Sequence, residues 1–389
     1  MALHVLIVPD KFKGTLTARA AAGAVARGWR RARPGDALDL LPMSDGGDGF
    51  GEVTSALLEA RHRSVRTLDA AHRSCRATWW FRPDDATAII ESARIVGLAM
   101  LPQGKYHPFD LDTEGLAGVI RAAARSGARR CLLGIGGSAT NDGGFGVARA
   151  LGWEFLDREG RPIERWVGLE KLDCIGAPAR SGWFDEMQVA VDVQNPLLGP
   201  RGATRIYGPQ KGLRPGDFAL AERCLGRLVG VVRKQFGRDF AKEPGSGAAG
   251  GLGFGLAAFL GAKLEPGFAL FARLAAIERH LRAADLVITG EGAIDASTFM
   301  GKGAGQIAQR CRRLGIPCVG LAGVVSNPAQ SRRRFTRVHA LADLTTSSQA
   351  MAQPARWLER LAQQVAGSLP GVSGRRGATH VIRRHATMR

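Results

Sequence analysis

Hydrophobic and polar positions follow the same order at the two ends of the chain. Residues 4–9 form a continuous apolar run, which is typical of a strand buried on both faces of a parallel sheet. Thr15 or Thr17 can cap the alanine-rich segment that follows, which we expect to be helical. A second strand at 37–43 and a helix from about Phe50 complete a βαβα pattern.

The C-terminal part repeats this order. Strands are expected at 284–289, 317–322 and 338–342, and helices at 302–314 and 348–368. Because alternating strands and helices favour a parallel sheet covered by helices, the two ends together predict one doubly wound α/β domain.

The middle of the chain has a different pattern. Apolar runs at 77–81 and 87–91 flank Pro83-Asp84-Asp85 and predict a hairpin. We further expect a helix at 113–126, strands at 130–135 and 187–193, and a glycine-rich loop at 245–255 that opens a helix. The fold is therefore predicted to be α/β, with a discontinuous domain formed by residues 1–68 and 283–369 and an inserted α/β domain at 69–282.

Composition and charge narrow the class of partner. The 389 residues are 45% hydrophobic, which is ample for two domains, and carry a formal net charge of +19. Such an excess favours phosphate-bearing partners. Part of it comes from residues 370–389, which we expect to be a disordered basic tail. With only two Tyr and no basic stretch interleaved with aromatic residues, specific nucleic-acid binding is not expected.

The cysteines and the N-terminus bear on the compartment. None of the six Cys is paired at metal-ligand spacing, and we expect buried thiols in a reducing compartment. The N-terminal apolar run lacks a basic flank and reaches Asp10 and Lys11 too soon for a signal peptide. No apolar run approaches the length of a membrane span. We predict a cytoplasmic protein with no membrane partner.

Four acidic turns follow predicted strands, which predicts a site at one edge of a sheet. They are Asp10-Lys11, Asp45-Gly46-Gly47-Asp48, Asn141-Asp142-Gly143-Gly144 and Glu291-Gly292. Ligands of open α/β sheets bind at the carboxyl ends of the strands. Carboxylates there can hold Mg²⁺, and glycine lets backbone N–H groups face phosphate oxygens.

The stretch LGIGGSATNDGGFGVARA at 133–150 is the strongest single element. Its glycines and small polar side chains can contact an anion, namely Gly136, Gly137, Ser138, Thr140 and Asn141. Asp142 can bind a metal, accept a proton or simply cap the following helix. Lys211, in the turn 208–212, is either a charge for phosphate or carboxylate, or a solvated surface lysine.

The chain lacks the motifs of three enzyme classes, namely P-loop nucleotide hydrolases, nicotinamide dehydrogenases and triad hydrolases. Gly301-Lys302-Gly303 lacks the upstream glycine and the following Ser or Thr of a Walker A loop. The first strand is followed by DKFKG rather than a dinucleotide fingerprint, and no His accompanies a Ser or Cys nucleophile motif. Phosphoryl transfer, which needs positioning and charge neutralisation more than covalent chemistry, fits what is left.

Together these motifs resemble the type I glycerate kinase family. The matching segments, in the order found in the family, are PDKFKGTLTA at 9–18, LPMSDGGDG at 41–49, GIGGSATNDGGFGVARALG at 134–152, DVQNPLLGPRGA at 192–203, YGPQKGL at 207–213, GSGAAGGLGFGL at 245–256, ITGEGAID at 288–295 and GKG at 301–303. Each is weak alone, but together they are highly specific.

The resemblance implies an ATP-dependent kinase that phosphorylates D-glycerate by Mg²⁺-assisted in-line transfer. The expected product is 2-phosphoglycerate, with the 3-phosphate as the other outcome. The fold it implies is a flavodoxin-like, Rossmann-like parallel-sheet domain made from both chain ends, with a second α/β domain inserted and the site in the cleft between them. The oligomeric state stays open, with a homodimer as one arrangement.

Site residues follow from the matching positions. Asp45 or Asp192 is expected as general base, and Asp48, Asp142 or Glu291 as magnesium ligand. Lys11, Lys13 and Lys211 would neutralise phosphate or carboxylate charge. The remaining expected substrate or nucleotide contacts are Asp10, Gly46, Gly47, Gly136, Gly137, Ser138, Thr140, Asn141, Asn195, Gly250, Gly251, Asp295 and Lys302. For Asp295, capping of the next segment is the stronger interpretation.

The segment at 110–118 departs from the family pattern, and so does the stretch at 92–97, where family members commonly have an Ala-Ser-Gly-Leu-like sequence. Family members usually show a Thr-rich run and then Gly-x-Gly-Glu-Leu where this chain has Asp110-Leu111-Asp112 and Ala117-Gly118. This departure leaves open a kinase for another small hydroxy acid. A non-catalytic nucleotide-binding regulator is the further alternative.

Overall fold

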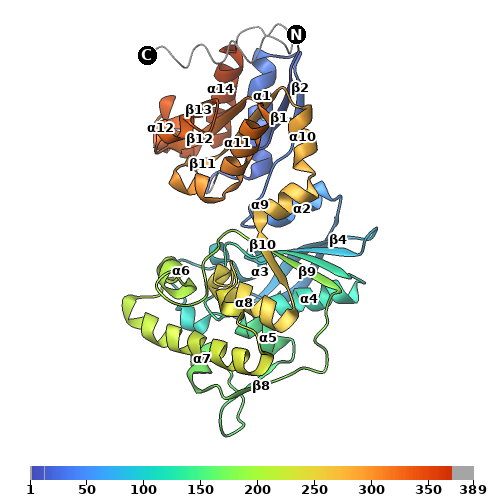
Figure 1. Cartoon of the computed structure of the whole chain (residues 1–389), viewed down its shortest axis with the longest axis vertical. Helices are drawn as coiled ribbons and strands as arrows, with labels where there is room; N and C mark the ends of the chain where they lie inside the picture. The colour runs from blue at the N-terminus through green and yellow to red at the C-terminus, as the bar shows by residue number, and fades with distance from the viewer. Residues whose placement is uncertain (1, 13, 370–389) are drawn as a thin grey trace. The chain divides into compact units, whose positions relative to one another are not determined.

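The computed structural model describes residues 2–12 and 14–369 and separates into two compact units (Figure 1). One unit comprises Met1–Met43 and Ala276–Arg389, and the other comprises Ser44–Ala275. Lys13 and the predicted tail at 370–389 lie outside the described residues.

The first unit is built on five parallel strands. In spatial order they are β13 (Arg337–Ala340), β12 (Cys318–Val325), β11 (Leu286–Ile294), β1 (His4–Ile7) and β2 (Ala37–Leu40). Numbered within this unit alone, the order is 2-1-3-4-5, which is the flavodoxin order. The expected flavodoxin-like α/β fold is therefore confirmed.

Helices cover both faces of this sheet (Figure 1). They are α1 (Ala18–Ala32), α10 (Ile277–Ala283), α11 (Gly303–Leu314), α12 (Pro328–Arg332), α13 (Ser347–Ala352) and α14 (Pro354–Gly367). Thr17 caps α1 by accepting a hydrogen bond from the Ala20 N–H at 3.1 Å. The apolar faces of α1 and α14 share one core with Val5 and Ile7 of β1.

The expected helix at 348–368 is two helices in the structure. α13 ends at Ala352 and α14 begins at Pro354. Proline has no N–H to donate, so it is tolerated in the first turn of a helix but not in its interior.

The second unit contains a six-stranded mixed sheet. In spatial order the strands are β10 (Lys263–Pro266), β9 (Glu186–Val191), β6 (Arg130–Gly134), β5 (Thr87–Glu91), β4 (Ser74–Arg82) and β3 (Arg61–Leu68). The first four are parallel, and the antiparallel pairing of β5 with β4 confirms the predicted hairpin.

The boundaries between the units differ from those expected at 68/69 and 282/283. β3 pairs with β4 along its whole length, so residues 44–68 group with the second unit. The segment from Ala276, with α10, groups with the first unit because Asp285 donates its backbone N–H to the carbonyl of His4 at 2.8 Å.

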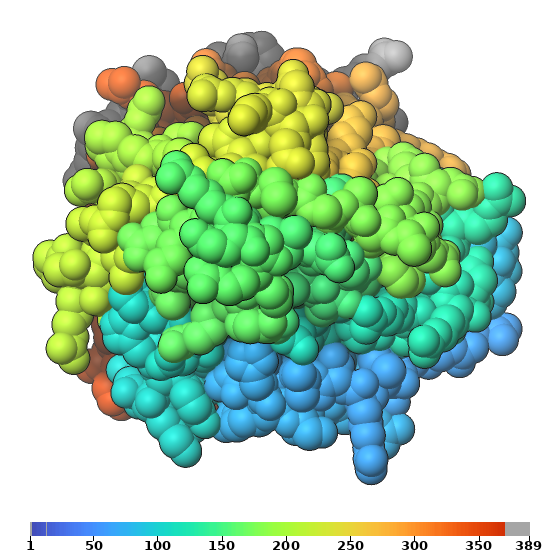
Figure 2. Space-filling model, turned by 90° about the horizontal axis from the view of Figure 1, so that it is seen from below, coloured from blue at the N-terminus to red at the C-terminus, as the bar shows by residue number. Residues whose placement is uncertain are grey.

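Helical layers cover the second sheet. The helices are α2 (Phe50–Leu57), α3 (Ala93–Val96), α4 (Gly115–Arg125), α5 (Phe145–Ala150), α6 (Ala203–Lys211), α7 (Phe218–Phe236), α8 (Ala248–Leu260) and α9 (Gly267–Leu274). α2 and α9 pack on one face around Phe50 and Leu270, whereas α4 and α8 pack on the other. A further core joins α7 to the small hairpin of β7 (Glu154–Leu156) and β8 (Cys174–Gly176). In Figure 2 this green segment covers much of the face turned to the viewer.

Candidate active site

Many of the predicted site residues lie at the carboxyl ends of three parallel strands in the second unit. β5 ends at Glu91, β6 runs into the turn that begins at Gly136, and β9 is followed by Asp192. Parallel strands end at the same edge of their sheet, so these three segments lie next to one another. The turn 45–48 lies over the same edge, because Gly136 donates its N–H to the Gly46 carbonyl at 3.2 Å.

Glu91 holds the turn that follows Asp48. Its two carboxylate oxygens accept hydrogen bonds from the N–H groups of Gly49 and Gly51, each at 2.9 Å. The side chain is buried and also pairs with Arg94 at 3.4 Å. The sequence analysis missed Glu91, although a carboxylate at the end of a continuous apolar strand was a usable signal.

Two carboxylates crowd over adjacent glycines at the end of β6. A Cβ at position 137 would lie 2.0 Å from Asp48 Oδ1, and one at position 136 would lie 2.9 Å from Asp192 Oδ2. Gly137 also has a left-handed φ of 80°. Only glycine fits both demands, because it has no Cβ and tolerates positive φ.

The donor set of this edge fits a magnesium ion. Mg²⁺ is usually held by one or two carboxylates, with water and substrate phosphates as the other ligands. Asp48 and Asp192 provide two such groups next to glycine N–H groups that can face a phosphate. Asp45 lies in the same turn, where its Oδ1 accepts the Gly47 N–H at 3.1 Å.

Asp142 is engaged by donors of the chain itself. Its Oδ2 accepts hydrogen bonds from the Thr113 N–H at 3.0 Å, the Thr113 hydroxyl at 2.7 Å and the Gly146 N–H at 2.9 Å. Its Oδ1 accepts from the Gly144 N–H at 3.2 Å. The structure therefore favours the capping interpretation over the expected metal ligand. Burial, followed by the charge of Asp112, raises the pKa of Asp142 to about 6.

Lys211 is buried, so the alternative of a solvated lysine is wrong. It lies in the last turn of α6, and its Nζ donates to the carbonyl oxygen of Thr140 at 2.6 Å. Burial lowers its pKa to about 8, while the charges of Asp142 and Asp192 act in the opposite direction. Lys211 thus places a positive charge beside the Ser138–Asp142 turn.

The small polar residues of that turn are paired with one another or with α6. The hydroxyls of Ser138 and Thr140 share a hydrogen bond at 2.8 Å. Asn141 donates from Nδ2 to the Thr204 hydroxyl at 3.2 Å, whereas its buried Oδ1 has no hydrogen-bond partner among the described residues. The structure therefore brings these predicted residues together, with their side chains buried.

Asn195 is fixed by Tyr207, a residue that the sequence analysis did not single out. The Tyr207 hydroxyl donates to Asn195 Oδ1 at 2.6 Å, and Asn195 Nδ2 donates to the Arg201 carbonyl at 2.8 Å. Burial, and then the charge of Asp192, raises the pKa of Tyr207 to about 12. Both polar ends of Asn195 thus have partners within the chain, which favours a supporting role over the expected substrate contact.

The second glycine-rich loop packs against the first. Gly250 accepts the Gly143 N–H at 3.0 Å, and a Cβ at Gly250 would lie 1.9 Å from the Thr140 carbonyl oxygen. Ala249, Gly250 and Gly251 all have positive φ. Gly250 and Gly251, expected as anion contacts, therefore serve the close approach of two backbones.

The first unit gathers a separate set of predicted residues at its switch point, between β1 and β11. Asp10 donates its N–H to the Gly290 carbonyl at 2.8 Å and accepts the Lys11 N–H on its own carboxylate at 2.7 Å. Lys302 Nζ lies 3.7 Å from Glu291 Oε2. In flavodoxin-like sheets this is the edge where ligands bind.

One expectation in this unit changes, and one interpretation is confirmed. Glu291 does not follow a strand as a turn residue, because β11 continues to Ile294 by pairing with β12. Asp295 caps the short 3₁₀ helix Ala296–Met300 by accepting the N–H groups of Ser297 and Thr298 at 2.8 and 3.3 Å. The hydrogen bonds from Ser297 are the largest influence that lowers the pKa of Asp295.

Within the described residues, no helix is both long and apolar enough to cross a membrane.

Comparison with known proteins gives one consistent result. The sequence model of the glycerate kinase family matches residues 5–369. A glycerate kinase of Bacillus subtilis is 34% identical over 94% of this chain and 98% of its own length, and a glycerate 2-kinase of Escherichia coli is 35% identical over 84% and 86%. A crystal structure of a glycerate kinase 2 from Salmonella typhimurium superposes with a TM-score of 0.80 at 32% identity, covering 95% of this chain and 98% of that one. The resemblance drawn from the motifs is confirmed, and the chain belongs to the glycerate kinase family.

Proposed function

We propose that this chain is an ATP-dependent kinase that transfers a phosphoryl group to D-glycerate and forms 2-phosphoglycerate. The observation that carries the proposal is the placement of Asp48 and Asp192 over Gly136 and Gly137 at the carboxyl ends of β6 and β9. Carboxylates beside glycine amides suit a magnesium-bound phosphate. The glycerate 2-kinase of Escherichia coli, at 35% identity, supports the choice of acceptor and product.

Within this proposal Asp45 acts as the general base. The Gly47 N–H fixes one oxygen of Asp45 at 3.1 Å and so orients the carboxylate. A base must lie within hydrogen-bond reach of the hydroxyl that attacks the phosphorus. Asp48 and Asp192 would hold the magnesium ion, which neutralises charge on the phosphoryl group when it is bound.

Cationic side chains complete the proposed machinery. Lys211, buried beside the Ser138–Asp142 turn, would offset negative charge at the second unit. Lys11, Glu291 and Lys302 belong to the first unit, at the edge where a flavodoxin-like sheet binds its ligand. We propose that they contact the nucleotide.

The test is an ADP-release assay on purified protein with MgATP. D-glycerate, L-glycerate, glycolate and tartronate are compared as acceptors, and phosphorus NMR of the product assigns the phosphorylated position. We expect turnover selective for D-glycerate and a 2-phosphate. Turnover of a different hydroxy acid would overturn the acceptor, a 3-phosphate would overturn the product, and nucleotide binding without any turnover would favour a regulator.

Variants test the base. Asp45→Asn should lower kcat by about two to four orders of magnitude, because proton transfer to a positioned carboxylate contributes on that scale. Asp84→Asn, which changes an exposed carboxylate in the β4–β5 turn of the same unit, is the matched control. Equal turnover of the two variants would reject Asp45 as the base.

A further inference from the structure

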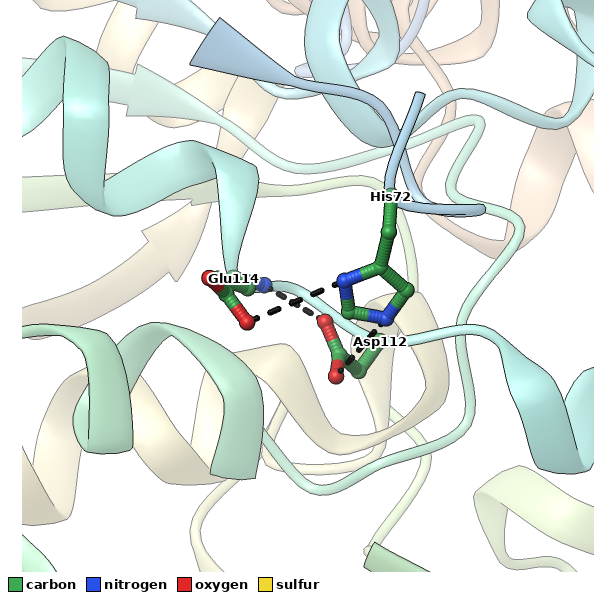
Figure 3. Close-up of side chains that lie close together, drawn as sticks. All are labelled: His72, Asp112 and Glu114. Atoms are coloured by element: carbon green, nitrogen blue, oxygen red, sulfur yellow. Dashed lines mark hydrogen bonds and ion pairs between the residues drawn. The ribbon is translucent and has the colours of Figure 1, made fainter. Parts of the chain in front are cut away.

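A histidine meets two carboxylates of the segment that departs from the family pattern, next to the Ser138–Asp142 turn. His72 lies in the turn between β3 and β4, and its ring sits between Asp112 and Glu114 (Figure 3). His72 Nε2 is 3.3 Å from Asp112 Oδ2, and Nδ1 is 3.7 Å from Glu114 Oε2. Each ring nitrogen therefore faces a carboxylate oxygen. Only the protonated imidazolium can donate from both nitrogens.

The charges around the ring favour its protonated form. The hydrogen bond with Asp112 has the largest effect and raises the pKa of His72. Burial of the half-exposed ring lowers this pKa, whereas the negative charge of Glu114 raises it. The positive charge of Arg149, on α5, lowers the pKa of His72. Its guanidinium is held near the ring by ion pairs with Glu114 at 3.0 Å and Glu164 at 2.7 Å.

Two further charged groups complete the surroundings of the ring. On the turn that carries His72, Arg73 is paired with Asp69 at 2.6 Å. Asp142 is also near the cluster, because the charge of Asp112 adds to the effect of burial in raising the pKa of Asp142.

The cluster is joined directly to the Ser138–Asp142 turn. Asp112 Oδ1 accepts the Glu114 N–H at 2.9 Å, which closes a tight turn around Thr113. Thr113 donates its N–H and hydroxyl to Asp142 Oδ2, and its hydroxyl oxygen accepts the Val147 N–H at 3.0 Å. The segments pack tightly here, because a Cβ on Gly146 would lie 2.7 Å from Asp112 Oδ1.

We propose that His72 is a positioning residue for phosphoryl transfer: its imidazolium bridges Asp112 and Glu114 and so fixes Thr113, Asp142 and the turn that carries Ser138. This role rests on the proposed function, because that turn lies beside Asp48 and Asp192 in the proposed site. His72 acts through the chain and does not touch substrate. When the ring loses its proton, it can no longer form ion pairs with both carboxylates, and the turn is held less firmly.

The same three side chains could also be taken for a metal site, since their ligand atoms lie within 4.8 Å of one another. Two observations favour a protonated His72 ring over a bound metal ion. The ring presents a different nitrogen to each carboxylate, whereas a metal ion uses one. The guanidinium of Arg149 also lies against Glu114, where a second cation would be repelled.

The first experiment compares three full-length variants by the pH profile of kcat/KM for D-glycerate. His72→Asn removes the charge and keeps a residue that tolerates the left-handed backbone at this position, where φ is 58°. His72→Lys keeps a charge that does not titrate near neutrality. His62→Asn is the control, because His62 is on β3 and its ring contacts Trp80 instead.

We expect kcat/KM of the wild type to fall as the pH rises through the His72 pKa. His72→Asn should lose this inflection and lie about ten- to a hundredfold below the wild type at low pH, because small misplacements of reacting groups cost that much. His72→Lys should recover activity without the inflection, and His62→Asn should match the wild type. A wild-type profile in His72→Asn would overturn the proposal.

A second readout does not depend on turnover. The His72 pKa, measured by NMR on the full chain, should lie above the ordinary value of about 6.5. Amide hydrogen exchange of Gly144 and Gly146 should be faster in His72→Asn than in His62→Asn. Unchanged exchange in His72→Asn would overturn the positioning role of His72. Because this readout needs no turnover, it separates a failure of that role from a failure of the proposed kinase function. Zinc binding that requires His72 and raises wild-type kcat/KM would replace the proton with a metal ion.

Discussion

Lys211 donates a hydrogen bond from its Nζ to the carbonyl oxygen of Thr140 at 2.6 Å, and both residues are buried. This contact ties the last turn of α6 to the turn Ser138–Asp142. A buried ammonium is costly without charged partners, and Asp142 and Asp192 are the negative groups that act on it. Lys211 thus serves both the packing of the turn and the charge of the proposed site.

The buried ammonium predicts a rise in stability at alkaline pH. The pKa of Lys211 is lowered to about 8 in the folded chain, from an ordinary 10.5. The unfolded chain therefore binds more protons than the folded one between these values, and the free energy of unfolding should increase by up to about 3 kcal/mol. Urea unfolding at pH 7 to 10 measures it. Lys211→Met should lack this rise, whereas Lys263→Met, which removes an exposed lysine of β10, should retain it.

Asp142 predicts the opposite slope at acidic pH. Burial raises its pKa to about 6 from 3.8, so the folded chain holds a proton that the unfolded chain has released between these values. The free energy of unfolding should fall by roughly 3 kcal/mol as the pH rises from about 4 to 6. Asp142→Asn should remove this contribution, and its amide group should also clash with the Gly144 or Gly146 N–H donors. Identical slopes in the two proteins, by urea unfolding, would contradict the burial of a titrating carboxyl.

Strands that are buried on both faces could be predicted from the sequence, and an edge strand could not. β1 and β6 are nearly continuous apolar runs, which only a covered parallel sheet accommodates. β3 reads RHRSVRTL and exposes several of its arginines at the edge of the sheet. Its polar residues protect a free edge but hide the strand from pattern recognition, and this moved the domain boundary.

In the candidate site, too, some features could be predicted from the sequence and others could not. Motif order predicted that Asp45, Asp48 and Ser138 matter, and the structure brings these segments to one edge of the second sheet. The role of Asp142 could not be assigned, because it depends on Thr113, a donor from a distant segment. Capping by Asp295 could be anticipated, since its partners follow directly in the chain. Local partners are visible in a sequence, and partners brought by the fold are not.

Glu91 should be needed for stability more than its neighbour Glu52. Both oxygens of Glu91 are occupied by the amides of Gly49 and Gly51, and an amide side chain would turn its NH₂ group toward one of these donors. Glu91→Gln should lower the free energy of unfolding by about 1–3 kcal/mol, the cost of an unsatisfied buried donor. Glu52→Gln breaks only an exposed pair with Arg94 and should cost less than about 1 kcal/mol. Urea unfolding of the two variants at neutral pH measures this difference. Equal losses in the free energy of unfolding would show that the Glu91 carboxylate is dispensable.

The approach of Asp48 to Gly137 should matter for turnover beyond its effect on stability. Gly137→Ala strains a left-handed backbone and drives a methyl group into Asp48 Oδ1, 2.0 Å from the ideal Cβ position. Gly127→Ala is the matched control, because Gly127 has a φ of 85° in the same unit and nothing within 4 Å of its Cβ position. The backbone penalty should be about 1–2 kcal/mol in both variants. Only Gly137→Ala should also lower kcat/KM, by about a hundredfold, because it displaces the carboxylate proposed to hold magnesium. If ADP release falls equally in both variants, strain alone accounts for the loss and the carboxylate at position 48 is not a ligand.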